Sequence, residues 1–308
     1  MHFANIFRGR TMAKARFNQF QFVRQILLAL TCLVLLTNFA IADTLAEAKK
    51  AYEANDYEKM FKIFLSSAEL GDVESQYKVS DLYFRGVGVK KNYIEAVKWA
   101  QVAANKSFPK AQCILGYLYQ NGNGVTQNFV DAAKWYSLAA EQGNRHAQNN
   151  LGSLYEDGNG LKQNFSEAVK WYRISAEHGL NNAQNRLGIM YAEGKGVKQD
   201  YKESILWFRL AAVKGETNAQ FNLGYAYREG QGVPQDYKES VKWYRLAAEK
   251  GNADAQTELG KMYDSGLGVI RDHNEAEKWY HKAAEQGDEE SKYFINNTND
   301  FDFDNDFS

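Results

Sequence analysis

Hydrophobic and small residues recur along this chain with a helical spacing, and the whole pattern repeats every 36 residues. Gln148, Leu151, Gly152 and Tyr155 lie on one face of a predicted helix, because steps of three and four residues return to the same side of an α-helix. The same kinds of residue occur at the same phase in the neighbouring segments. A fixed period of about 20–50 residues is typical of a stack of identical supersecondary units.

The second predicted helix of each unit carries a tryptophan. Its apolar face combines small and aromatic side chains, which in the second unit are Phe129, Ala132, Trp135, Tyr136, Ala139 and Ala140. All six tryptophans lie 36 residues apart, and none lies elsewhere: Trp99, Trp135, Trp171, Trp207, Trp243 and Trp279. We expect the tryptophans to supply much of the buried area and the alanines to let the next hairpin pack closely.

Each unit also contains a glycine turn and a marked helix start. Gly158 and Gly160 represent the turn, which lacks the lysine and the preceding strand of a phosphate-binding loop. The second helix opens with Asn164, followed three residues later by Glu167, a pair typical of an N-terminal helix cap. Because every unit has equivalent residues, we interpret the glycines as turns and the carboxylates as caps rather than as catalytic groups.

These patterns predict an all-α fold, an α/α solenoid of about six 36-residue helical hairpins over residues 72–290. Residues 43–71 match the second-helix phase with a shorter turn, and we expect them to form a degenerate N-terminal capping hairpin. Residues 291–308 carry several aspartates and phenylalanines, and we expect a disordered acidic tail there.

The first 42 residues differ from the rest of the chain. Five basic residues and no acidic residue are followed by an apolar run over 26–41 and by Ala40-Ile41-Ala42, a small-x-small cleavage site. The run is shorter than the ~20 residues of a spanning helix. We therefore predict a signal peptide cleaved after Ala42 and a periplasmic or secreted protein. The alternative is an uncleaved anchor in the inner membrane, and Met12 is an alternative start.

Charge and cysteine content narrow the set of partners. Without the five basic residues of the N-terminal segment, 32 of the 37 basic residues remain against 38 acidic ones, which disfavours a nucleic-acid partner. Cys32 lies in the export segment, so the mature chain contains Cys113 alone and no internal disulfide pair. We interpret Cys113 as a small hydrophobic residue of a helix, with intermolecular pairing as the alternative.

The unit that begins at Ala147 resembles the Sel1-like repeats, relatives of the tetratricopeptide repeats. The resemblance recurs six times between about residues 45 and 290, and in the third unit it rests on Ala147-Gln148, Leu151-Gly152, Tyr155, Gly158-x-Gly160, Asn164, Glu167-Ala168 and Lys170-Trp171-Tyr172. It implies a right-handed superhelix and an adaptor role, often in exported bacterial proteins that act in envelope assembly, signalling or host contact. A cysteine-rich subgroup binds β-lactams, but its cysteines are missing here. The first unit departs most from the pattern, at Ser75, Ser80, Ala100 and Ser107.

We predict a non-catalytic scaffold that binds a protein or peptide partner on the concave face of the solenoid, without a cofactor. On each first helix, the residues after the glutamine and after the glycine vary between units, so core packing does not dictate them. Asparagines there can hold a peptide backbone, and aromatic rings can contact apolar side chains. The candidate partner-binding residues are Tyr117, Asn149, Asn150, Asn185, Arg186, Phe221, Asn222 and Tyr225.

The alternative function is a cell-envelope enzyme or a protein that binds β-lactams or peptidoglycan. Its support is two Ser-x-x-Lys segments, Ser75 to Lys78 and Ser107 to Lys110, which lack a Lys-Thr-Gly partner. The five histidines are scattered and have no companions at metal-ligand spacing, so no metal site is expected. The sequence therefore favours a protein that is not an enzyme.

Overall fold

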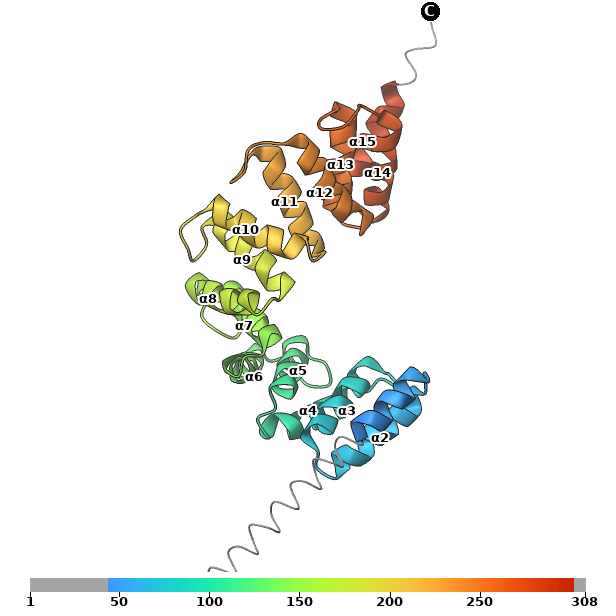
Figure 1. The fold of residues 1–308 in the computed structure, drawn as a ribbon, viewed down its shortest axis with the longest axis vertical. Coiled ribbons are helices and arrows are strands. Elements are labelled where there is room, and N and C mark those ends of the chain that lie inside the picture. The colour runs from blue at the N-terminus through green and yellow to red at the C-terminus, as the bar shows by residue number, and fades with distance from the viewer. Residues whose placement is uncertain (1–43, 302–308) are drawn as a thin grey trace, which may run out of the picture. The chain divides into compact units, whose positions relative to one another are not determined.

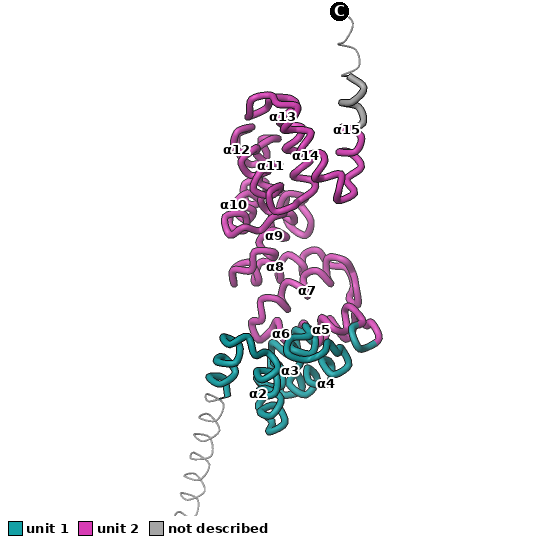
Figure 2. Tube along the Cα trace, turned by 90° about the vertical axis from the view of Figure 1, so that its right-hand side faces the viewer, with its two compact units in different colours: residues 1–114, 123–125 teal, residues 115–122, 126–308 magenta. Residues whose placement is uncertain are grey.

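The computed structural model describes residues 44–301, and every regular element in that range is an α-helix (Figure 1). The predicted export segment over 1–42 and residues 302–308 lie outside the described range. The chain divides into two compact units: one extends to residue 114 and includes 123–125, and the other contains 115–122 and continues from 126 (Figure 2). Each unit is built from antiparallel helical hairpins, which confirms the predicted all-α solenoid.

Six hairpins follow one another, each made of a first helix and a second helix. The first helices are α3 (Val73–Arg85), α5 (Pro109–Asn121), α7 (Arg145–Asp157), α9 (Asn181–Glu193), α11 (Thr217–Glu229) and α13 (Ala253–Ser265). The second helices are α4 (Tyr93–Asn105), α6 (Phe129–Glu141), α8 (Phe165–Glu177), α10 (Tyr201–Ala212), α12 (Tyr237–Glu249) and α14 (His273–Glu285). From α6 onward, each second helix contacts the first helix that follows it, so within the second unit the hairpins pack on one another in chain order.

Further helices flank the six hairpins. Residues 44–53 are helical and precede α2 (Tyr57–Glu69), at the place where the sequence predicts a capping hairpin. At the other end of the array, α15 spans Glu289–Phe301. Residues 291–301 are therefore helical, where the sequence analysis expected a disordered tail.

Two side chains hold the start of α15 against the last hairpin. Ser291 is fully buried, and Phe294 stacks on Tyr280 of α14 with 4.8 Å between the ring centroids. The sequence analysis gave weight to the aspartates further on and did not anticipate the burial of Ser291 or the stacking of Phe294.

The helix starts follow the predicted capping chemistry. In α8, the Asn164 Oδ1 atom accepts hydrogen bonds from the backbone N–H groups of Ser166 and Glu167, at 3.1 and 3.2 Å. The Glu167 carboxylate binds the Lys170 ammonium at 3.2 Å. Equivalent N-cap bonds occur in the other second helices, so the repeated acidic residues belong to helix starts.

The residue after each tryptophan lies deeper in the core than the tryptophan itself. Five tryptophans are half-buried and Trp279 is 7% exposed, whereas the fully buried side chains include Tyr136, Tyr172, Tyr244 and Tyr280. The indole N–H of Trp207 donates to the Glu203 carboxylate near the helix start at 3.0 Å, and that of Trp279 donates to Glu275 at 3.1 Å. The core thus centres on tyrosine and alanine, and tryptophan covers its edge.

Each buried ring packs on the glycine of a first helix. A Cβ atom at Gly152 would lie 2.8 Å from the Tyr172 ring. In the first hairpin both positions carry small residues: Ala100 replaces the tyrosine, and the Ser80 hydroxyl donates to the Ala96 carbonyl at 2.7 Å. A large ring on the second helix therefore requires the absence of a side chain on the first.

The second glycine of each turn makes a contact between hairpins. Gly160 has φ 70°, and a Cβ atom there would lie 2.3 Å from the carbonyl group of Phe129, which begins α6 in the preceding hairpin. Gly196 lies against Phe165 in the same way. The sequence pattern predicted a turn at these glycines, and the structure adds that they bring two hairpins into backbone contact.

The repeated glutamine also links each hairpin to the one before it. Gln148 Nε2 donates to the Ala140 carbonyl at the end of α6, at 3.1 Å, and the glutamines of the other five hairpins make the equivalent bond. Gln148 Oε1 lies 3.0 Å from Nδ1 of His178, so this ring nitrogen carries the proton. Since buried polar groups need partners, the glutamine is a structural residue.

Replacing Gly152 by alanine tests the packing of α7 on α8. We expect Gly152→Ala to lower the free energy of unfolding by about 1–3 kcal/mol, because the added methyl group overpacks against the Tyr172 ring. This loss exceeds the gain in helix propensity of about 1 kcal/mol. In a Tyr172→Ala background the same change should be neutral or stabilising. Urea denaturation of the four proteins measures both effects, and equal losses in the two backgrounds would contradict this packing.

Gly160→Ala and Gly143→Ala form a matched pair that isolates the contact between hairpins. Both glycines have positive φ, 70° and 83°, but no atom lies within 4 Å of a Cβ at Gly143. Both changes strain the backbone by about 1–2 kcal/mol, and Gly160→Ala alone also displaces the start of α6. We expect the larger drop in melting temperature for Gly160→Ala. Equal drops in thermal unfolding would show that the turn glycine has no stacking role.

Candidate functional site

The predicted partner-binding residues lie on α5, α7, α9 and α11, all within the second compact unit. We call the surface that these side chains form the first-helix face; it comprises Tyr117, Asn149, Asn150, Asn185, Arg186, Phe221, Asn222 and Tyr225. Tyr117 and Tyr225 are 41% and 38% exposed, and Arg186 is exposed as well. Asn185 is buried, and the other four side chains are half-buried.

The position directly after the glutamine braces neighbouring helices. Asn185 on α9 accepts a hydrogen bond from the Asn222 side chain on α11 at 2.9 Å. Phe221 occupies the same position in α11 and packs on Tyr244, with 5.7 Å between the ring centroids. Asn185 and Phe221 therefore have packing roles, between hairpins and within a hairpin respectively, whereas Tyr117, Arg186 and Tyr225 are exposed.

The amide pair on α7 has an unmet hydrogen-bonding requirement. Asn149 Nδ2 donates to Asn150 Oδ1 at 3.2 Å, while the buried Asn149 Oδ1 atom has no hydrogen-bond partner. An unpaired buried polar atom costs about 1–3 kcal/mol. A donor that reaches this oxygen would recover that free energy.

A pocket of about 250 Å³ opens between α9, α10 and α11. Asn222 and Tyr225 of the first-helix face line it, together with Ile189, Ala192, Glu193, Tyr201, Ser204, Ile205, Phe208, Ala226 and Gln231. The sequence analysis did not identify Ala192 and Phe208 as candidates, because each contributes to the pocket by being smaller than its equivalent in a neighbouring hairpin. A position-by-position comparison of the six units reveals Ala192, because the other five units have larger side chains at this position.

Beyond Tyr225 the first helices are joined by ion pairs. The Arg228 guanidinium binds the Glu258 carboxylate and lies 5.2 Å from the centre of the Tyr225 ring. Lys261 binds Glu258 at 3.0 Å and Glu290 at 2.7 Å. Glu258 and Lys261 occupy variable positions of a first helix, whereas Arg228 and Glu290 were not predicted. Their charges are paired with one another, so they tie α11, α13 and α15 together.

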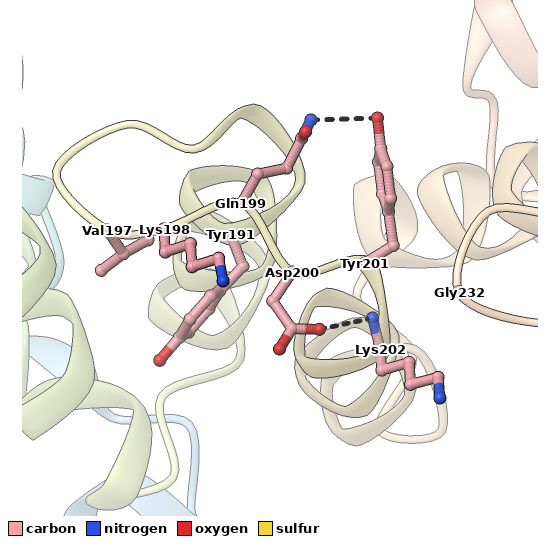
Figure 3. Close-up of a pocket in the computed structure, with 8 residues that line it drawn as sticks. All are labelled: Tyr191, Val197, Lys198, Gln199, Asp200, Tyr201, Lys202 and Gly232. Carbon is pink, nitrogen blue, oxygen red and sulfur yellow. Dashed lines mark hydrogen bonds between the residues drawn. The ribbon is translucent and has the colours of Figure 1, made fainter.

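A larger and more open hollow of about 710 Å³ lies at the turn of the fourth hairpin (Figure 3). Gln199 Nε2 donates to the Tyr201 hydroxyl at 3.0 Å, and Asp200 accepts from the Lys202 backbone N–H at 3.0 Å, as the dashed lines in Figure 3 show. These polar groups hold the turn and begin α10. The hollow is therefore a weaker candidate site than the pocket beside Tyr225.

The two Ser-x-x-Lys segments occupy structural positions. Ser75 is 2% exposed, and Ser107 adopts φ 60° in the turn before α5. The ammonium groups of Lys78 and Lys110 lie over the Tyr77 ring, 5.9 and 6.0 Å from its centre.

Between residues 44 and 301, no three His, Cys, Asp or Glu side chains are grouped as metal ligands. In the same part of the chain, no helix has the length and apolar character needed to cross a membrane.

A stack of hairpins with a repeated core and one variable face is the architecture of a protein-binding α-solenoid. Sel1 repeats match this chain over residues 73–108, 109–144, 145–180, 181–215, 217–252 and 253–288. The chain therefore belongs to the Sel1 repeat family, whose members are generally protein–protein interaction scaffolds and typically non-catalytic. The comparison with curated proteins found no match.

Two solved structures of Sel1-like repeat proteins are similar to the chain over most of its length. One is a protective antigen of uropathogenic Escherichia coli strains, with 35% identity, a TM-score of 0.74, and coverage of 83% of this chain and 56% of that one. The chain thus spans about half the length of the antigen. The other is a Sel1 repeat protein from Oxalobacter formigenes, with 34% identity, a TM-score of 0.72, and coverage of 78% and 96%.

Cys113 occupies the position directly after the glutamine in α5, and burial raises the pKa of its thiol to about 12 from an ordinary value of 9. Between pH 9 and about 12 the thiol therefore stays protonated in the folded chain but ionises in the unfolded chain. The contribution of this group to the free energy of unfolding is fully present below pH 9 and is lost as the pH rises towards 12. Between pH 8 and 10.5 we expect the wild type to lose about 2 kcal/mol more than Cys113→Ala. Urea denaturation at both pH values measures this, and parallel pH dependence of the two proteins would contradict a buried thiol.

Proposed function

We propose that the chain is an exported, non-catalytic scaffold whose first-helix face binds an extended segment of a protein partner. The observation that carries this proposal is the contrast between the two kinds of position on α7, α9 and α11. The residues that pack in the core repeat from hairpin to hairpin, whereas the variable Asn185 and Asn222 contact each other between neighbouring first helices, and Asn222 and Tyr225 line a pocket.

Neighbouring first helices are close enough for one extended segment to contact several of them. Asn185 and Asn222 are hydrogen-bonded although they are 37 residues apart. Packed helices lie about 8–10 Å apart and an extended chain advances about 3.3 Å per residue, so each hairpin matches about three residues of a partner. Amides such as Asn150 suit the partner's backbone, and the rings of Tyr117 and Tyr225 suit its apolar side chains.

Export is part of the same proposal. Residues 1–42 have the composition of a signal peptide, and we propose cleavage after Ala42 and a periplasmic or secreted location, with an inner-membrane anchor as the alternative. The similar Escherichia coli protein is described as a protective antigen, which supports a location that antibodies can reach. Envelope assembly, signalling and host contact are the processes that fit such a scaffold. The buried Ser75 gives no support to an envelope enzyme.

Photo-crosslinking in cells tests which face binds the partner. A benzoylphenylalanine residue is placed at Arg186 or Tyr225 on the first-helix face, or at Lys170 or Lys242 as matched exposed positions on second helices. We expect the first pair to give one common adduct and the second pair to give none, because the partner covers the first helices only.

Mass spectrometry of the adducts identifies the partner and the residues joined. Adducts of equal yield from both pairs, or adducts confined to Lys170 and Lys242, would contradict binding on the first-helix face. Adducts whose joined residues scatter over many unrelated proteins would do so as well.

A further inference from the structure

The pocket between α9, α10 and α11 has the size of a site for a single side chain. Figure 1 shows these three consecutive helices, and each packs on the next. The pocket measures about 250 Å³. An enclosed apolar cavity of about 150 Å³ accommodates benzene, and small-molecule sites occupy about 300–1,000 Å³. The space therefore suits one bulky side chain of a partner rather than a free metabolite.

The pocket lies where three positions carry smaller side chains than the equivalent positions of the two neighbouring junctions. A junction here means the contact between two consecutive first helices. At the preceding junction the corresponding residues are Glu156, Arg186 and Met190, and at the following junction they are Arg228, Glu258 and Met262. Here they are Ala192, Asn222 and Ala226.

The neighbouring junctions show how the same space is filled. The Glu156 carboxylate accepts a hydrogen bond from the Tyr172 hydroxyl at 2.6 Å, whereas Phe208 stands in the place of that tyrosine and has no hydroxyl. At the following junction Arg228 and Glu258 form an ion pair across the space. The repeat fold therefore accepts large residues at these positions, and the small ones are not required by packing.

The lining of the pocket defines the chemistry of its occupant. Ile189, Ile205 and Phe208 offer apolar surface, and polar groups that suit a peptide backbone come from Asn222, Tyr225, Tyr201, Ser204 and Gln231. Glu193 is the charged residue of the lining, and it is the last residue of α9, where the helix dipole adds negative potential. Its carboxylate binds the Lys195 ammonium at 2.6 Å in an exposed ion pair, so a basic residue of the partner would take the place of Lys195. An apolar side chain next to a lysine or arginine complements both features.

We propose that this pocket is the anchor site for one bulky apolar side chain, of the size of leucine, methionine or phenylalanine, in a partner segment that carries a basic residue next to it. The proposal rests on binding at the first-helix face. It adds the class of sequence that the face selects and the residues that select it.

Selection of peptides provides the test. Random dodecapeptides displayed on phage are selected on the purified protein, and the affinity of an enriched peptide is measured by fluorescence anisotropy. We expect the enriched peptides to share an apolar residue beside Lys or Arg. Replacing that apolar residue by alanine should weaken binding about tenfold or more.

A filled pocket supplies the matching protein variant. Ala192→Glu with Ala226→Met introduces the side chains that stand at the preceding junction, and Ala226→Met alone is a milder version. We expect both to weaken binding of the enriched peptide, the double variant by about tenfold or more, and to make the alanine-substituted peptide bind like the parent. Ser265→Glu adds the same charge to another first helix without filling the pocket, and it should leave the affinity within about twofold.

The contradicting outcomes are equally definite. Unchanged affinity in a folded Ala226→Met variant, enrichment without a shared apolar residue, or no enrichment at all would overturn the anchor site. The crosslinking from Arg186 and Tyr225 does not depend on which side chain enters the pocket. Position-specific adducts, together with pocket variants that bind the peptide as the wild type does, would therefore contradict the anchor site but still support the scaffold function.

Discussion

The structure depends on close approach between helices at positions where a glycine provides no side chain. One glycine in each first helix from the second hairpin onward lets a tyrosine or phenylalanine ring pack directly on the helix backbone, as Gly152 does for Tyr172. A second glycine, in the turn, touches the start of the preceding second helix, as Gly160 does at Phe129. Because both contacts are steric, they set the distance within a hairpin and between hairpins, and the hydrogen bond from the repeated glutamine then aligns the neighbours. A hairpin so dependent on its neighbours gains its stability from the stack.

Because the glycines and the glutamine maintain the stack, other positions on the first helices are available for binding. The residues that maintain the stack repeat in every hairpin, whereas those on the first-helix face differ from one hairpin to the next. Asn185 and Phe221 show that the boundary is not sharp, since both variable positions also brace the array. The pocket beside Tyr225 arises in the same way: the glycine, glutamine and cap residues hold α9, α10 and α11 in place, and small residues between them leave a space that neighbouring junctions fill.

Much of the fold follows from sequence periodicity alone. The 36-residue spacing predicted the hairpins, the glycine turns and the caps, because each of them depends on local residues such as Asn164 and Glu167. Depth of burial was predicted less well, since Tyr172 and Trp171 are adjacent and only the packed neighbours decide which is covered. The helix at 289–301 was missed because its contacts with α14 are long-range. The pocket was missed for a related reason. Its walls come from three helices, and it forms because small side chains leave space between them.

Hydrogen exchange measured along the whole chain tests most directly whether the hairpins are stabilised by their neighbours through the turn glycines. The informative variant is Gly196→Ala, which places a methyl group against the Phe165 backbone between the third and fourth hairpins. Nearest-neighbour stacking predicts faster exchange in α7 to α10 and unchanged exchange in α13 and α14. Unaltered protection throughout the chain would contradict a role for the glycine contact, and uniform loss of protection in all helices would contradict stabilisation by neighbours alone.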